Sequence, residues 1–283
     1  NELSNEISIN GVLPKLNVSK SGYYDWLNRV PSNQEIRKQE VILEIKKTHL
    51  ESFEIYGSPK ITIMLNRMGL DVSQKTVANY MRESGLKARY VRKPSYKPLL
   101  EGFNAKLNNI LVREFNPSSP NEMWCTDITY IWTKNGFVYL TSIMDLYSRK
   151  IISWKLSDSL STDAVIECVN EAISRRGISN PVVIHSDRGS QYVSKRYYDA
   201  IRGNLIPSYS RKGNPWDNAC IESFHALIKR EWINFYKITD INHAKSIVFE
   251  YIETFYNTIR IHGACGYLSP TKFETEVNNA LNH

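Results

Sequence analysis

The apolar residues near the start of the chain recur with the 3.6-residue period of a helix. Ser32 and Glu35 form a capping-box pattern, and Val41 and Ile45 follow on one face of the helix that this pattern begins. A helix is therefore predicted to start just after residue 32.

Two further helices are predicted at 58–69 and 73–85, where a serine opens and a glycine closes each apolar pattern. Ser58 is expected to be the N-cap of the first, with Pro59 at the first helical position. A turn of four residues, 69–72, joins the pair. This arrangement is typical of a helix-turn-helix motif.

The second of these helices would present polar residues to a DNA groove, namely Gln74, Lys75, Asn79 and Arg82. Helix pairs around a short glycine turn also occur in many proteins that never touch DNA. The motif therefore favours DNA binding without establishing it.

From residue 123 onward the spacing changes to the two-residue period of strands, with many β-branched and aromatic residues. The expected order is strand, hairpin turn, strand, strand, helix and strand, over residues 124–132, 134–136, 137–144, 150–156, 161–177 and 181–185. Three antiparallel strands, a crossover helix and a fourth strand predict a mixed α/β sheet.

Prolines separate the helical part from the strand-rich part. Pro94, Pro98, Pro117 and Pro120 interrupt any regular element between them. We expect a helical region with the helix-turn-helix over 1–93, a linker over 94–120, and the α/β unit with later helices over 121–283.

Positive charge is concentrated in the first part of this 283-residue chain, whose net charge is +7. Residues 1–110 carry 17 Lys and Arg against 11 Asp and Glu, a difference of +6, whereas residues 111–283 carry 19 against 18. The candidate phosphate contacts here are Lys75, Arg82, Lys87, Arg89, Arg92 and Lys93. A solvated basic linker is the alternative interpretation of the same charges.

Composition excludes several classes of protein. No apolar stretch is long enough to span a membrane, and the N-terminus lacks the pattern of a signal peptide. Four widely spaced cysteines, with no C-x-x-C pair, favour neither a disulfide framework nor a cysteine zinc site. We expect a soluble, cytoplasmic protein with no membrane partner.

Three carboxylates stand at positions that packing alone does not favour. Asp127 interrupts an apolar strand, where an unpaired charge would cost several kcal/mol. Asp187 ends another apolar strand, where α/β sheets often place ligands, although aspartate is also a common turn residue there. Glu222 lies in the first turn of a predicted helix that Asn218 would cap, and alone it is an ordinary surface residue.

Four ordered motifs together give the sequence a resemblance to a known family. They are Trp124-x-x-Asp127-Ile-Thr-Tyr, His185-Ser-Asp187-Arg-Gly-Ser-Gln-Tyr192, Ser210-Arg-Lys-Gly213-Asn-x-x-Asp217-Asn-Ala-x-x-Glu222-Ser-Phe, and Tyr256-Asn-x-x-Arg260-x-His262 with Ser269-Pro270. The chain resembles bacterial insertion-sequence transposases of OrfB type, in the DDE transposase and retroviral integrase superfamily. The resemblance extends to the helix-turn-helix segment at 36–94.

The resemblance implies an RNase H-like integrase catalytic core, preceded by an all-α helix-turn-helix domain and followed by a helical extension. It implies that Asp127, Asp187 and Glu222 are the catalytic triad and the metal ligands. The expected cofactors are two Mg²⁺ or Mn²⁺ ions per site, since oxygen ligands prefer these ions to zinc. The family usually places 35 residues between its second Asp and its Glu, whereas 34 lie between Asp187 and Glu222 here.

The implied reaction is cleavage of the element's DNA ends, followed by joining of the 3′-OH to target DNA. The partners would be double-stranded DNA, at least a second copy of the chain, and a protein from an upstream reading frame, inside a bacterial cell. Arg211, Lys212, Lys229 and Arg230 would contact phosphates near the site. Since the chain begins with Asn1, we expect that an upstream portion precedes it.

Two other functions remain open at this level. A DNA-binding regulator with an inactive core would be expected to lack one of the three carboxylates, and none is missing. A nuclease that cuts without joining uses the same metal site, so the sequence does not separate it from a transposase.

Overall fold

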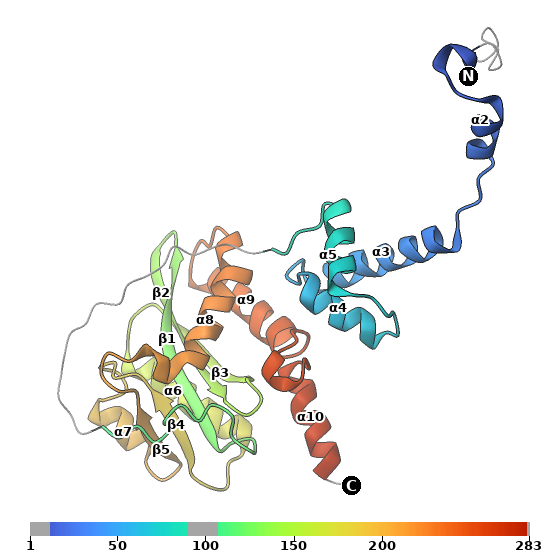
Figure 1. Ribbon diagram of the computed structural model, residues 1–283. Coiled ribbons are helices and arrows are strands. Elements are labelled where there is room, and N and C mark those ends of the chain that lie inside the picture. Colours follow the sequence, from blue (N-terminus) through green and yellow to red (C-terminus); the bar gives the residue numbers. More distant parts are fainter. Residues whose placement is uncertain (1–11, 90–106, 282–283) are drawn as a thin grey trace. The chain divides into compact units, whose positions relative to one another are not determined.

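The computed structural model describes residues 12–89 and 107–281. The chain divides into two compact units, 1–87 and 88–283, and each is described separately below. Figure 1 shows the helical first unit and the sheet-containing second unit.

The first unit is helical, as its periodicity predicted. After the short 3₁₀ turn η2 (Pro14–Leu16), its helices are α2 (Lys20–Leu27), α3 (Asn33–Glu51), α4 (Ser58–Arg67) and α5 (Gln74–Glu83). The capping box before α3 is confirmed, since Ser32 and Glu35 each accept a backbone hydrogen bond from the other. Ser73 likewise caps α5 by accepting from the Thr76 N–H.

The expected cap of α4 is wrong by one position. Gly57 is the N-cap, in extended conformation, and Ser58 is already the first helical residue. Since glycine is tolerated at an N-cap, Pro59 moves to the second helical position without leaving a donor unpaired. The helix-turn-helix is confirmed, and Ile61, Leu65 and Val77 are fully buried where α4 packs on α5.

The second unit is built on a five-stranded mixed sheet, which confirms the predicted fold class (Figure 1). The strands are β1 (Met123–Thr133), β2 (Gly136–Asp145), β3 (Ile151–Ser157), β4 (Val182–Ser186) and β5 (Leu205–Tyr209), in the order β3-β2-β1-β4-β5. The first three strands pair antiparallel, and β4 runs parallel to both β1 and β5. The central strand is therefore β1.

Helices cover the sheet, and those of this unit are α6 (Thr162–Arg176), α7 (Lys195–Ile201), α8 (Ala219–Glu231), α9 (Ile241–Phe249) and α10 (Pro270–Leu281). Shorter turns are η3 (Pro215–Asn218), η4 (Ile233–Phe235), the π-helical η5 (Glu250–Tyr256) and η6 (Gly263–Cys265). α6 packs on β2 and β3, and α8 packs on β1 and β2. The core under α6 includes Trp124, Val169 and Tyr192, all buried.

Residues 107–116, which the sequence assigned to a linker, pack against the second unit. Leu111 is fully buried, and the Ser208 Oγ accepts hydrogen bonds from the N–H groups of Ile110 and Leu111. Of the predicted linker, residues 94–106 lie outside the described residues, whereas 117–120 are described.

The C-terminal helices are tied to the sheet unit by buried polar contacts. The Asn257 side chain hydrogen-bonds both backbone groups of Ile151 on β3. Arg260 donates to both carboxylate oxygens of Glu231, at 2.8 and 2.7 Å, and Tyr251 donates to the same group. In residues 12–89 and 107–281, no helix is both long and apolar enough to cross a bilayer.

Candidate active site

Asp127 is held on the central strand, on the face that α8 covers. Its partner across the β1–β2 ladder is Ser142, and both side chains meet His225 of α8. The His225 Nδ1 lies 3.4 Å from the Asp127 Oδ2, and the His225 Nε2 lies 3.3 Å from the Ser142 Oγ. The buried imidazole therefore fixes the orientation of this carboxylate.

Asp187 follows β4 directly, at the carboxyl end of the strand. Its Oδ1 accepts a hydrogen bond of 2.8 Å from the Gly189 N–H, which holds the side chain in a tight turn. The side chain is reached by solvent, but surrounding protein atoms weaken its hydration and the negative charge of Asp127 repels it. Together these raise the pKa of Asp187 to about 6.

Glu222 lies in the first turn of α8, whose buried face is formed by Ile221, Phe224 and Ile228 as predicted. Desolvation by neighbouring atoms, with repulsion from Asp127 and Asp187, raises the pKa of Glu222 to about 7. The three predicted carboxylates thus influence one another, although Asp127 lies on β1, Asp187 directly after β4, and Glu222 on α8.

Asn218 occupies the predicted N-cap of α8, but its side chain does not make the expected cap bond. Instead the Asn218 Nδ2 donates to the Thr126 carbonyl on β1, at 3.1 Å. This contact ties the start of α8 to the strand that carries Asp127.

The three carboxylates do not form a closed metal cage in this conformation. Across the described parts of the chain, no three His, Cys, Asp or Glu side chains are placed so that they would together hold an ion. Asp187 and Glu222 are both solvent-exposed, and Asp187 is held by its hydrogen bond from the Gly189 N–H.

Asp217 organises the loop before α8, a role that the sequence did not reveal. This fully buried carboxylate accepts from the Asn109 Nδ2, from the Arg113 Nε, and from the Arg211 backbone N, Nε and Nη2, all within 3.0 Å. The Arg211 and Arg113 bonds hold the pKa of Asp217 well below its usual range. The sequence feature that could have pointed to this role is the position of Asp217 in the same motif as Glu222, five residues before it.

We expect the Asp217→Asn variant to lose about 2 kcal/mol of stability at pH 7, because an amide cannot receive both arginines as a carboxylate does. A carboxylate with a lowered pKa stabilises the fold above its unfolded pKa of 3.8, and this contribution disappears as the pH falls further. The difference in free energy of unfolding between the variant and the wild type should therefore become smaller as the pH falls from 5 to 2.5.

Urea unfolding followed by circular dichroism measures both effects. The exposed Asp199 provides the matched control, since Asp199→Asn should change stability little at either pH. An Asp217→Asn variant as stable as the control would contradict the clamping role.

Two further residues near the site have structural partners that sequence patterns did not predict. His185 is fully buried between the hydroxyls of Ser208 and Ser210, at 2.8 and 3.0 Å, and its burial lowers its pKa to about 4. Arg188 donates to the Ser210 carbonyl. Both hold the loop after β4 against β5.

The candidate DNA contacts lie in different surroundings. Lys75, Arg82 and Lys87 are exposed in the first unit, whereas Arg89 lies over the Phe235 ring, 4.0 Å from its centre, in the second. Arg92 and Lys93 lie outside the described residues.

The basic residues predicted beside the carboxylates have protein partners as well. Arg211 and Lys212 are exposed, although Arg211 pairs with Asp217. Lys229 donates to the Thr129 Oγ1 at 2.6 Å, and Arg230 donates to the Ala226 carbonyl at 3.2 Å. Glu222, His225 and Lys229 follow one another along the same side of α8.

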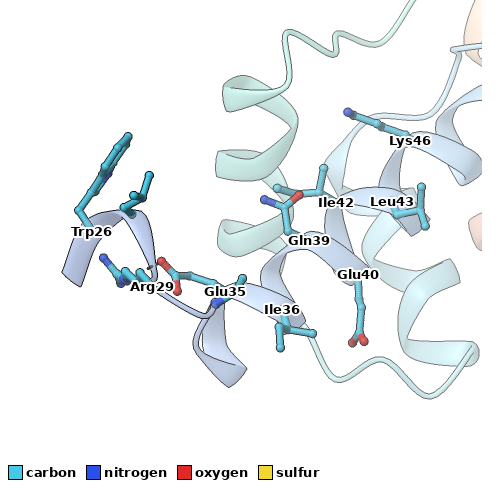
Figure 2. A pocket seen from close by; sticks show the side chains of 11 residues that line it. Trp26, Arg29, Glu35, Ile36, Gln39, Glu40, Ile42, Leu43 and Lys46 are labelled. Carbon is cyan, nitrogen blue, oxygen red and sulfur yellow. Dashed lines mark hydrogen bonds and ion pairs between the residues drawn. The ribbon is translucent and has the colours of Figure 1, made fainter. Parts of the chain in front are cut away.

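A separate groove of about 970 Å³ lies between α2 and α3 in the first unit. Figure 2 shows Arg29 and Glu35, two of its lining residues, pointing toward one another, and they form an ion pair of 3.1 Å. Trp26, Ile36 and Leu43 make much of its lining apolar. The groove has no cluster of acids, so it does not compete with the carboxylates as a catalytic site.

Comparison with known proteins finds family matches in both the helical and the sheet-containing parts of the chain. Residues 117–215 and 204–270 match two integrase core domain families, and residues 36–94 match an HTH-like domain family. The HTLV-2 integrase catalytic core domain, solved in complex with magnesium, aligns at 16% identity and a TM-score of 0.43, over 56% of this chain and 98% of that one.

Two transposases resemble the chain along most of its length. The transposase for insertion sequence element IS904 of Lactococcus lactis subsp. lactis (strain IL1403) is 36% identical, over 88% of this chain and 98% of that protein. Transposase InsF for insertion sequence IS3A of Escherichia coli (strain K12) is also 36% identical, over 96% of this chain and 95% of that protein. With 36% identity to these transposases over most of both chains, and with matches to integrase core and HTH-like domain families, the chain belongs to the IS3 family of insertion-sequence transposases.

Proposed function

We propose that the protein cuts the DNA ends of an insertion sequence and joins the resulting 3′-OH to a target strand, using Asp127, Asp187 and Glu222. The observation that carries this proposal is the match to insertion-sequence transposases and to an integrase core, with all three motif carboxylates present, and the raised pKa values of Asp187 and Glu222 are consistent with it. Three acids that interact this closely, with two raised pKa values, are typical of a functional site.

The donor set fits Mg²⁺ or Mn²⁺. All three side chains offer hard oxygen ligands, and a divalent cation would relieve the repulsion that raises the pKa values of Asp187 and Glu222. We assign two ions to the site, held by Asp127, Asp187 and Glu222. Bound there, they would activate the attacking oxygen and stabilise the leaving oxygen.

The protein's own residues prepare this site. His225 and Ser142 orient Asp127, and the Gly189 N–H orients Asp187. The Asp217 clamp and the Asn218 contact with β1 fix the start of the helix that carries Glu222. The reaction needs no covalent bond between protein and DNA, since water and then the 3′-OH attack the phosphodiester.

The proposal includes DNA binding by both units, which the matches to an HTH-like domain and an integrase core support. We assign Lys75, Arg82, Lys87, Arg89, Arg92 and Lys93 to contacts with the element's ends, and Arg211, Lys212, Lys229 and Arg230 to phosphates near the carboxylates. Two element ends must be cut together, so at least a homodimer would act, alone or with an upstream-frame protein. We propose that this takes place in the bacterial cytoplasm.

Removal of divalent metal is the direct test of the cofactor. Purified protein with a labelled duplex of the element's terminal repeat should cleave and join in Mg²⁺ or Mn²⁺, and excess EDTA should abolish both products. Re-adding Mg²⁺ should restore them. Activity that persists in EDTA, or that only zinc restores, would contradict the assignment, and cleavage without any joined product would favour the nuclease.

A further inference from the structure

Three aromatic side chains stand exposed together near the tip of the β1–β2 hairpin. Tyr130, Trp132 and Phe137 are 60%, 64% and 48% exposed. Trp132 and Phe137 are directly paired across the strands, and Tyr130 lies diagonally from Phe137. We call these three residues the hairpin aromatic cluster.

The rings of this cluster hold one another in place. The Phe137 ring meets the rings of Trp132 and Tyr130 edge to face, with centres 4.8 and 5.3 Å apart. The opposite face of the hairpin is buried through Ile131, Thr133 and Val138. The hairpin therefore presents adjacent aromatic surfaces to solvent. Because burying such rings is favourable, an exposed group of them is typical of a binding surface.

Lys229 adds a positive charge to one side of the cluster. Its Nζ contacts the Thr129 Oγ1 at 2.6 Å and lies 4.3 Å from the centre of the Tyr130 ring. Because consecutive side chains leave opposite faces of a strand, an ammonium group that reaches both lies at the edge of β1. The lysine comes from α8, the helix that also carries Glu222.

The cluster is also close to the carboxylates along the strand. Tyr130 is three residues from Asp127 on β1, which corresponds to about 10 Å at the usual rise of a strand. Because this separation is odd, the two side chains leave opposite faces of the strand, and Lys229 lies at the edge between these faces. Stacked nucleotides are spaced about 3.4 Å apart along a DNA strand, so about three of them would span this distance. A strand held at Asp127 would reach the cluster by passing Lys229.

We propose that the hairpin aromatic cluster binds unpaired bases of the DNA strand whose phosphate lies at the carboxylates. This rests on the proposed function. The occupant is DNA, since the rings adjoin a cation and share a strand with the catalytic acid, which suits an anionic chain with flat apolar bases. The bases must be unpaired, because in a duplex their faces are covered by neighbouring bases.

The proposal is tested by binding without catalysis. In EDTA, fluorescence anisotropy compares the affinity for a fully paired terminal duplex with that for the same duplex carrying four unpaired bases at its end. Wild-type protein should prefer the unpaired end. The Trp132→Leu variant should lose about 5- to 100-fold in affinity for that DNA and little for the paired duplex.

Four further measurements define the result. Trp132→Phe keeps an aromatic ring and should retain most of the preference, and Tyr198→Leu, at an exposed tyrosine on α7, should retain all of it. A 5-iodouracil placed among the unpaired bases should crosslink to the hairpin on irradiation. Size-exclusion chromatography with light scattering should give the same mass for Trp132→Leu as for wild type.

Several outcomes would overturn the proposal. These are a Trp132→Leu variant that binds both DNAs like wild type, an equal loss for both DNAs, or a changed oligomer, which would make the cluster a contact between copies. Because binding is measured without metal, these results are independent of whether the three carboxylates catalyse cleavage.

Discussion

The Asp127→Asn variant is expected to lose DNA cleavage and joining by about a thousandfold or more while remaining folded. Asparagine keeps the size of the side chain and can still contact His225, so the central strand should be undisturbed. It removes one of the three negative charges that would hold the proposed ions. The stabilisation that such ions give a transition state amounts to several kcal/mol, which corresponds to a factor of this size.

Single-turnover assays on the terminal duplex, with saturating Mg²⁺, measure this loss. Asp158→Asn is the matched control, because Asp158 is an exposed aspartate just after β3, and this variant should react at the wild-type rate. Thermal unfolding should give similar midpoints for all three proteins. Cleavage by Asp127→Asn within tenfold of wild type would refute the role of this residue.

The Arg260→Ala variant should be destabilised by about 3–5 kcal/mol. Arg260 and Glu231 are both largely buried, and the arginine makes two short hydrogen bonds to the carboxylate. Removing it leaves a buried negative charge without its cation, which is among the most costly single changes in a protein interior. The stability loss is measured as the change in the free energy of unfolding of the sheet-containing unit, obtained from urea denaturation.

Arg196→Ala supplies the comparison, because Arg196 pairs with Asp163 at the surface. Exposed ion pairs are worth at most about 1 kcal/mol, so this variant should unfold almost like wild type. Equal losses of unfolding free energy in Arg260→Ala and Arg196→Ala would show that burial does not determine how much the Glu231–Arg260 pair stabilises the protein. Replacing both Glu231 and Arg260 by apolar residues should recover part of the stability.

Local patterns predicted much of the fold. The turn at Lys134-Asn135-Gly136 and the alternation on either side of it determined β1 and β2, and Ser161 and Gly177 marked both ends of α6. These elements depend on neighbours a few residues away, which a sequence displays directly. The α4 cap was misplaced because Ser58 and Gly57 both suit that position, and local chemistry does not choose between them.

The candidate site was predicted in part. The motifs pointed to Asp127, Asp187 and Glu222, and the structure shows that these charges influence one another. The Asp217 clamp was not foreseen, because its partners Asn109 and Arg113 come from a segment that prolines marked as a linker, more than a hundred residues away. Contacts of this kind depend on tertiary packing, which cannot be inferred from the hydrophobic periodicity or the composition of the sequence.

The buried pair of Glu231 and Arg260 also has a consequence for the order in which the second unit can be assembled as the chain is synthesised. α8 carries Glu222 at one end and Glu231 at the other, and Glu231 has its cation only once residue 260 has been made. A nascent chain can contain all three acids and still lack the anchor of the helix that brings the last one to β1. A chain that ends before residue 260 therefore leaves the far end of the helix that carries Glu222 without its buried cation.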